Sequence, residues 1–284
     1  MIAREARGRE REAQHSLAAF LDDAGEEHRL WVAHDDALVG PVADFFADRQ
    51  LYIADGHHRY ETALNYRDVV RAQRSDLDAD DAVNFTLMGL TALEDPGLVV
   101  LPTHRILRNL DPARLAALDE TLAVNFTGEP LAGASADWLR SLAAATSGTA
   151  FVLIRPDGAT LLRLTDAGRA AMRVFNGDDA GASDAWRSLD VAALHALVLG
   201  NALGVTPEMV RAGEYVTYTR DATAAADAVR AGSGGHDGAQ LALLLNATPP
   251  AAIRDVARAG DRMPQKSTYF YPKLSTGLVI NPLW

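Results

Sequence analysis

The stretch LYIADGHHRYETALNYRDVVRAQR, residues 51–74, carries the clearest local structural signal in the chain. It opens with a short apolar run, and Gly56 follows this run as a turn residue. Beyond the glycine, apolar residues recur at helical spacing. The sequence therefore predicts a strand over 51–55, a tight turn at Gly56 and a helix over 59–74.

Outside this stretch, helical and strand patterns alternate along the chain. The predicted helices are a polar helix over 4–23, a helix over 36–49 interrupted near Gly40 and Pro41, and helices over 136–146, 190–203, 221–231 and 250–259. The predicted strands are 28–35, 82–93, 97–102, 149–155, 159–165, 214–219 and 239–246. The turn Pro156-Asp157-Gly158 predicts a hairpin, and 231–240 is predicted as a loop. This mixed order favours an α+β fold, a mixed sheet with flanking helices.

The chain has 284 residues, which is enough for one large domain or two modest ones. We expect an N-terminal helix over 1–24 and a motif-bearing lobe over 25–120. A second α/β lobe is expected over 121–259. Residues 260–284 are expected to form a C-terminal loop and strand that return to the motif-bearing lobe.

Composition excludes several classes of protein and site. The chain has no cysteine, so disulfides, thiolate metal sites and cysteine nucleophiles are absent. Its net charge of −11 disfavours a DNA-binding groove, because such a groove needs clustered positive charge. No apolar run is long enough to span a bilayer, and the charged start lacks the apolar stretch of a secretory signal. We therefore expect a cytoplasmic protein with no membrane partner.

Lysine is nearly absent from the chain. Of its 27 basic residues, only Lys266 and Lys273 are lysine. Codon bias towards arginine accounts for the excess of arginine. Both lysines nevertheless lie in one segment, residues 263–273, and arginine does not replace lysine where a compact, flexible point charge is needed. The distribution indicates that an ammonium group is required in that segment.

A run of polar residues and glycine follows the apolar run 51–54. Its members of interest are Asp55, Gly56, His57, His58, Arg59 and Glu61. A helix that starts at such a turn presents unpaired backbone N–H groups and the positive end of its dipole, which together attract anions. Gly56 permits close approach, and Arg59 adds a bidentate grip on phosphate. His58 can donate to a phosphate, His57 can shuttle a proton, and Asp55 or Glu61 can bind magnesium or act as a base.

Two other interpretations of this motif stay open. The first is a capped turn whose carboxylate and histidines only satisfy backbone groups. The second is a zinc site at His57 and His58, which their adjacency disfavours because neighbouring residues are poorly placed to chelate one ion. We therefore assign no metal ligands.

Two further motifs carry candidate ligand-binding residues. His104 and Arg105 follow the apolar run 97–102, and Lys266, Ser267 and Thr268 stand before three aromatic residues. The lysine and hydroxyl groups can bind phosphate oxygens, while the aromatics could stack on a base or fill the core. The segment is not a P-loop, because the glycines that precede the lysine of a P-loop are missing. Asp190 and His195 lie on a predicted helix, where His195 is expected to be a packing residue.

At these motifs the sequence resembles a known family. The stretches 52–63 (YIADGHHRYETA), 101–105 (LPTHR) and 263–274 (MPQKSTYFYPKL) are similar to the signatures of the bacterial domain-of-unknown-function family 1015, in the same order. Members of that family usually carry a long additional N-terminal region. The resemblance therefore implies that this chain is truncated or starts late.

The strand–DGHHR–helix element is also similar to the phosphate-binding motif of the ParB/sulfiredoxin superfamily. That likeness implies that Gly56, His57, His58 and Arg59 hold phosphates in a ParB/sulfiredoxin-like strand–turn–helix element. Sulfiredoxin chemistry is excluded, because it needs a cysteine.

The leading functional hypothesis is a protein that binds a phosphate-bearing small ligand, as a nucleotide-dependent phosphotransferase acting on a small metabolite. A nucleotide with Mg²⁺ is the candidate cofactor. The alternatives are a non-catalytic nucleotide-sensing module and a structural or interaction protein. The single-site form of the hypothesis predicts that Arg59, His104 and Lys266 point into one cleft. The sequence does not specify the oligomeric state.

Overall fold

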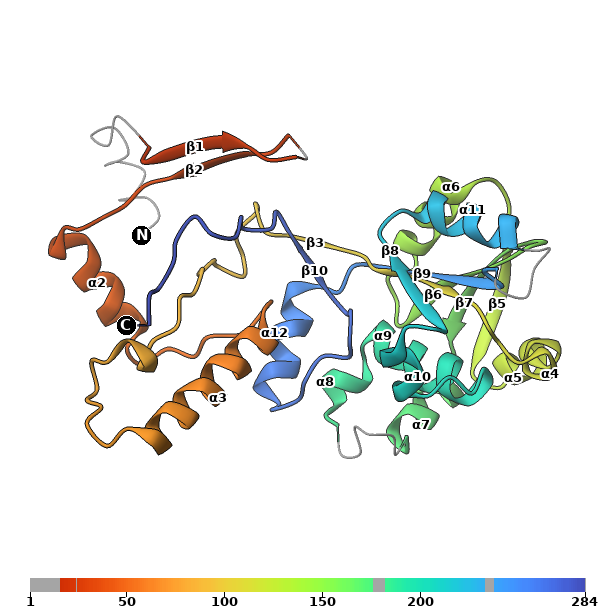
Figure 1. Ribbon diagram of the computed structural model, residues 1–284. Helices are drawn as coiled ribbons and strands as arrows, with labels where there is room; N and C mark the ends of the chain where they lie inside the picture. The colour runs from red at the N-terminus through yellow and green to blue at the C-terminus, as the bar shows by residue number, and fades with distance from the viewer. Residues whose placement is uncertain (1–15, 24, 176–181, 233–237, 284) are drawn as a thin grey trace. The chain divides into compact units, whose positions relative to one another are not determined.

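The computed structural model describes residues 16–23, 25–175, 182–232 and 238–283 (Figure 1). The chain divides into two compact units: unit 1 comprises residues 1–89 and 273–284, and unit 2 comprises residues 90–272. Both units contain helices and antiparallel strands, so the predicted α+β class is confirmed. Among the helices of the described ranges, none combines the length and apolar character of a bilayer span.

Unit 2 is built on a six-stranded sheet in which all neighbouring strands are antiparallel. Its order is β5-β7-β6-β9-β4-β8. The strands are β4 (His104–Leu107), β5 (Phe126–Leu131), β6 (Ala150–Arg155), β7 (Gly158–Leu164), β8 (Val216–Thr219) and β9 (Leu241–Leu245). Arg155 pairs with Gly158, so the hairpin predicted at 156–158 is confirmed. The strands predicted at 149–155, 159–165, 214–219 and 239–246 correspond to β6, β7, β8 and β9.

Helices cover both faces of this sheet (Figure 1). One face packs against α6 (Ser135–Ala144) and α11 (Ala222–Gly232). The other face packs against α5 (Leu118–Ala123), α7 (Asp166–Arg173), α8 (Asp184–Arg187), α9 (Asp190–Ala193), α10 (Pro207–Ala212) and α12 (Pro250–Arg258), and α4 (Pro112–Ala116) precedes α5. Side chains alternate between the faces of a strand, so Ile106 and Leu107 enter opposite cores. Two apolar layers therefore fix β4.

The helix predicted over 190–203 has two parts. α9 continues as a π-helical segment, η2 (Leu194–Ala202), in which the N–H of Leu203 donates to the carbonyl of Val198 at 2.9 Å. Six of its nine residues are buried, and the apolar residues among them show no periodicity that would separate an α-helix from a π-helix. π-helical turns are rare and frequently occur at functional sites.

A two-stranded sheet completes unit 2. β3 (Val99–Leu101), which confirms the strand predicted over 97–102, pairs with β10 (Tyr269–Tyr271). Tyr269 lies opposite Leu101. The lysine-bearing C-terminal segment is thereby attached to the chain immediately before β4.

Unit 1 contains fewer regular elements. They are the strands β1 (Ala18–Leu21) and β2 (Glu27–Leu30), the helices α2 (Asp36–Phe46) and α3 (His57–Gln73), and the short 3₁₀ turn η1 (Ala82–Asn84). The helix predicted over 59–74 is confirmed as α3, and part of the strand predicted over 28–35 is confirmed as β2. The helix predicted over 36–49 forms α2 without interruption, with Pro41 inside it.

The helix predicted over 4–23 is wrong where the structure describes it. Residues 18–21 form β1, which pairs with β2 through a turn in which Gly25 has a φ of 81°. Pairing with a later strand overrides the weak local helical pattern. Residues 4–15 lie outside the described part of the chain, as do residues 233–237 of the predicted loop.

Two predicted strands of the N-terminal third are also wrong. Residues 51–54 form no regular structure, no strand of the described ranges pairs with them, and Leu51 and Ile53 are exposed. Residues 82–93 begin with η1 and continue without regular structure. An apolar run becomes a strand only when a neighbour supplies the ladder of hydrogen bonds, and a local pattern does not reveal that neighbour.

The two units differ sharply in burial. All buried residues of the described chain lie between 103 and 270, and none of the described residues of unit 1 is buried. Most of the large exposed apolar side chains, such as Trp31, Phe85 and Met88, belong to unit 1. Since apolar burial is the main driving force of folding, unit 1 by itself has little to stabilise it.

We predict a corresponding difference in hydrogen exchange. Backbone amides open with free energies that range from near zero to the global value, depending on local burial. In exchange followed by mass spectrometry, peptides of β6 and β9 should stay protected far longer than peptides of α3. Equal protection of α3 and the central strands would contradict this account of unit 1.

Candidate functional site

The amino end of α3 starts at a glycine. Gly56 is the N-cap residue, with φ 83° and ψ 24°, in the left-handed region that non-glycine residues seldom adopt. A glycine N-cap provides no side chain, and no other side chain caps this helix end. The N–H groups of the first turn therefore remain available to an anion, and the helix dipole adds to their attraction.

Arg59 folds back onto this glycine. A Cβ atom built on Gly56 would lie 2.7 Å from Nη2 of Arg59 and 3.0 Å from its Nε. Any side chain at position 56 would therefore displace the guanidinium. The glycine thus has two functions: it permits the positive φ, and it lets Arg59 lie against the backbone at the helix start.

Asp55 brings two cations together at this site. Its Oδ2 lies 3.4 Å from Nη2 of Arg59 and 3.0 Å from Nζ of Lys273. The side chains of Asp55 and Arg59 are 55% and 77% exposed, so the ion pair itself contributes little to stability. Lys273 is one of the two lysines of the chain, and its contact with Asp55 places it beside the DGHHR motif within unit 1.

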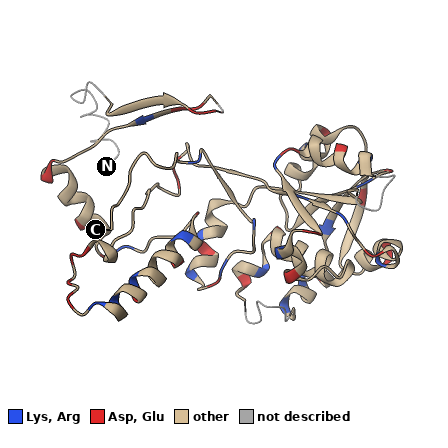
Figure 2. Cartoon of the chain, viewed as in Figure 1, with Lys and Arg blue, Asp and Glu red and all other residues tan. Residues whose placement is uncertain are grey.

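The histidines of the motif lie on the exposed first turn of α3. The rings of His57 and His58 are 4.1 Å apart, and Nδ1 of His58 is 3.5 Å from Oε2 of Glu61. The His58 side chain is 86% exposed. These groups can reach a ligand from solvent without rearrangement of a core. Figure 2 shows that basic positions recur along α3.

Arg105, from the second motif, is buried in unit 2. Its side chain is 1% exposed, and its two terminal nitrogens donate to backbone carbonyls: Nη1 to Thr103 and Nη2 to Lys266, the latter at 3.0 Å. Both terminal nitrogens therefore hold the chain itself. The second and third motifs meet at this arginine.

His104 is also buried, on the other face of β4. The backbone N–H of Leu245 donates to its Nδ1 at 3.3 Å, so the ring is held as the neutral tautomer with the proton on Nε2. Burial, together with the charge of Arg105, lowers the pKa of His104 to about 4. At neutral pH it is an uncharged structural group.

The lysine-bearing segment of unit 2 turns sharply. Lys266 has a φ of 56° and an exposed side chain, while Ser267 is buried and donates to the carbonyl of Pro264. Thr248 donates to the carbonyl of Ser267 at 2.9 Å. Thr268 follows at intermediate exposure. The hydroxyl of Ser267 is thus used within the turn, and only Lys266 presents a charged group to solvent there.

The aromatic residues after Thr268 have different environments. Phe270 is buried, so it fills the core. The guanidinium of Arg220 lies 4.2 Å from the ring centre of Tyr269. The sequence analysis missed Arg220, because its position directly after β8 became meaningful only when β10 was placed.

The structure therefore forms two groups of candidate residues. Unit 1 holds the DGHHR motif with Glu61 and Lys273, and unit 2 holds His104, Arg105 and the residues 266–268. The single cleft expected to contain Arg59, His104 and Lys266 stays a prediction, since these residues belong to different units.

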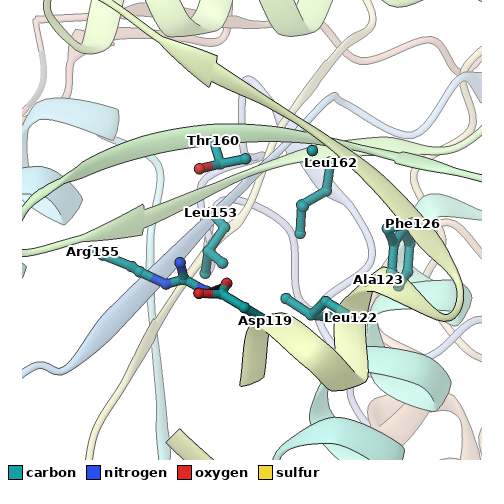
Figure 3. A pocket seen from close by; sticks show the side chains of 9 residues that line it. Asp119, Leu122, Ala123, Phe126, Leu153, Arg155, Thr160 and Leu162 are labelled. Atoms are coloured by element: carbon teal, nitrogen blue, oxygen red, sulfur yellow. Dashed lines mark hydrogen bonds and ion pairs between the residues drawn. The ribbon is translucent and has the colours of Figure 1, made fainter. Parts of the chain in front are cut away.

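Two further observations bear on where a ligand or a metal ion could bind. Within the described ranges, no group of three or more histidine and carboxylate side chains could hold a metal ion. A hollow of about 110 Å³ lies between α5 and the sheet. Arg155 and Asp119 point toward one another there (Figure 3) and form an ion pair. The other residues that line the hollow are mainly apolar, and none belongs to the three motifs.

His195 and Asp190 lie in the core of unit 2. Burial lowers the pKa of His195 to about 3, with a further contribution from the charge of Arg105. Burial raises the pKa of Asp190 to about 6, although hydrogen bonds from Thr149 and the backbone of Ala150 oppose the shift. The interpretation of His195 as a packing residue agrees with its apolar neighbours, but its Nε2 is buried without a hydrogen-bond partner.

We predict that unit 2 loses stability as the pH falls from 6.5 towards 4. His104 and His195 have folded-state pKa values below the unfolded value of 6.5, so between these values the unfolded chain binds more protons than the folded chain. Their contribution to the unfolding free energy is therefore fully present above pH 6.5 and is lost as the pH falls. Each histidine should change the unfolding free energy by on the order of 3 kcal/mol over this pH range. Asp190 acts in the opposite sense: its contribution is present below pH 3.8 and is lost as the pH rises through 6.

Urea unfolding at pH 7 and pH 4.5 measures this effect. The difference in unfolding free energy between the two pH values should shrink in His195→Gln and stay unchanged in the exposed control His58→Gln. A wild-type protein equally stable at both values would refute the assignment.

Comparison with known protein families gives a match over more than half of the chain. The family model described as a protein of unknown function (DUF1015) matches residues 4–192. No curated protein matches the chain, and no solved structure does. Since the family model covers more than half of the chain, the protein belongs to the DUF1015 family.

Proposed function

We propose that this protein binds a phosphate-bearing small ligand at the amino end of α3. The observation that supports this most strongly is the exposed, uncapped first turn, with the guanidinium of Arg59 lying on Gly56. Backbone N–H groups at a helix start and a nearby arginine are the groups that proteins use to hold phosphate. The proposed ligand-binding residues are Gly56, His58, Arg59 and Lys273.

Asp55 is the group that a phosphate must displace. In the free protein, its carboxylate is the anion that Arg59 and Lys273 contact, at 3.4 and 3.0 Å. A phosphate carries more charge and more acceptor oxygens than a carboxylate, so it can replace Asp55 as the partner of both cations. The pair of cations is thus already assembled before the ligand arrives, which reduces the entropy lost on binding.

The finer proposal is a nucleotide-dependent phosphotransferase. Once released from the cations, Asp55 is a hard oxygen ligand suited to Mg²⁺ carried by a nucleotide. Arg59 and Lys273 would neutralise phosphate charge, as phosphoryl transfer requires. Glu61 or His57 would take the proton of an acceptor hydroxyl. A cytoplasmic location remains part of this proposal.

A non-catalytic nucleotide-sensing module is the second candidate. The same geometry supports it, because holding a phosphate at a helix start does not by itself require chemistry. The exposure of the motif allows ligand exchange with solvent without any opening of the structure.

Binding is tested by thermal unfolding with ATP, with and without Mg²⁺. The wild-type melting temperature should rise with ligand concentration, because a ligand that binds only the folded state stabilises it. Arg59→Ala and Lys273→Ala should each weaken binding about 10- to 100-fold, which corresponds to the loss of one charge-assisted hydrogen bond. Arg67→Ala, on the same helix but paired with Asp68, is the matched control and should bind like the wild type. Equal losses in all three variants would disprove the site.

Turnover separates the enzyme from the sensing module. If the protein is a phosphotransferase, ADP should form from Mg·ATP in the presence of small hydroxylated metabolites, and Asp55→Asn should abolish that formation while phosphate binding persists. A sensing module predicts saturable binding with no steady product formation in either protein.

A further inference from the structure

Arg105 places a full positive charge inside the core of unit 2. Its side chain is 1% exposed, and among the described residues no carboxylate forms an ion pair with it. Burial lowers the pKa of Arg105 to about 10, which still leaves the guanidinium protonated at neutral pH. A buried charge without a partner is strongly unfavourable, so a compensating group is expected.

The contacts of Arg105 within the chain offset only part of this charge. The carbonyls of Thr103 and Lys266 accept from its terminal nitrogens, and its Cζ lies 5.6 Å from the ring centre of Tyr218. Carbonyl dipoles and an aromatic ring carry no net negative charge. The Nε of Arg105 is buried and has no hydrogen-bond partner.

Two more buried polar atoms near Arg105 lack partners. Tyr218 lies opposite Arg105 in the register of β4 and β8, so both side chains emerge on the same face of the sheet. The hydroxyl of Tyr218 and the Nε2 of His195 have no partner, and His195 lies within electrostatic range of Arg105. Buried polar groups are almost always hydrogen-bonded, so three such atoms in one region indicate a missing partner.

The three groups define the chemistry of that partner. The Nε–H of Arg105 and the O–H of Tyr218 are donors, and the Nε2 of neutral His195 is a donor in the tautomer that carries its proton on that nitrogen. Water could accept from them but would leave the charge uncompensated, whereas an oxyanion supplies acceptors and charge together. We propose that Arg105, Tyr218 and His195 form an anion site in unit 2 that binds a carboxylate or phosphate group, distinct from the site at α3.

Exposed cations lie on the segments that surround this cluster. Lys266 belongs to the turn whose carbonyl Arg105 holds, and Arg220 follows Tyr218 by two residues. Such charges raise the local concentration of anions and favour their entry. The cluster also explains why the second and third sequence motifs meet at one buried arginine rather than at the surface.

The test uses the full chain carrying Arg59→Ala, so that the site proposed at α3 does not contribute. Thermal unfolding is followed against sodium phosphate and against sodium acetate, with sodium chloride at the same ionic strength as the reference. At least one of the two anions should raise the melting temperature saturably above the chloride reference. Whichever anion does so identifies the class of the ligand.

Three variants locate the effect. Tyr218→Phe keeps the ring and removes the unpaired hydroxyl, so the apparent Kd should rise on the order of tenfold. Arg105→Met should lose the response, and Arg108→Met, which removes an arginine that bonds Thr217 on the neighbouring strand, should keep it. If Arg105→Met does not fold, Tyr218→Phe still provides the comparison.

Two results would overturn the inference. One is the absence of any anion-specific shift in the Arg59→Ala protein; if the wild type nevertheless shows a shift, the response belongs to α3 alone. The other is a shift that is unchanged in Tyr218→Phe. A shift that survives Arg59→Ala and weakens in Tyr218→Phe supports the second site, whatever the outcome at α3.

Discussion

The hydrogen bonds of Arg105 to two backbone carbonyls are the interaction on which the organisation of unit 2 depends. They join the chain at the start of β4 to the turn at Lys266, across a separation of 161 residues. Lys266, whose carbonyl accepts this bond, adopts a positive φ of 56°, which is uncommon for lysine. The bond thus connects a buried charge, a turn with a positive φ and the first residues of a strand. Loss of any one of them would leave polar groups unsatisfied in the core.

How much of the fold the sequence could predict differs between the two units. In unit 2, the strands β6, β7 and β9 were predictable because they are apolar runs bounded by clear turns, and the core supplies partners on both sides. In unit 1, comparable runs at 51–55 and 82–93 failed, since the described chain offers them no pairing neighbour and no buried face. Periodicity reports which face could be buried, and it does not report whether anything covers it.

The candidate site shows the same division. Gly56 and Arg59 were identifiable because a turn glycine followed directly by a helical pattern is a local signal. The structure adds that the glycine makes space for the guanidinium. Lys273 was recognised as unusual only by the rarity of lysine, and its contact with Asp55 depends on tertiary structure. The burial of His104 and Arg105 was not predictable, because β4 begins with these two polar residues and lies between two other strands of the sheet. The sequence pattern placed them at the end of the apolar strand 97–102, whereas in the structure they begin a separate, buried strand.

The position of β4 in the sheet also bears on how the protein is made. β4 spans residues 104–107, yet both of its neighbours come much later, at 216–219 and 241–245. During synthesis, β4 therefore leaves the ribosome well before either of its partner strands, and it stays unpaired until they have been made. Pairings of such long sequence separation close slowly, and an unpaired apolar strand is prone to aggregate. The polar pair at the head of β4 would keep that waiting segment hydrated until its partners emerge.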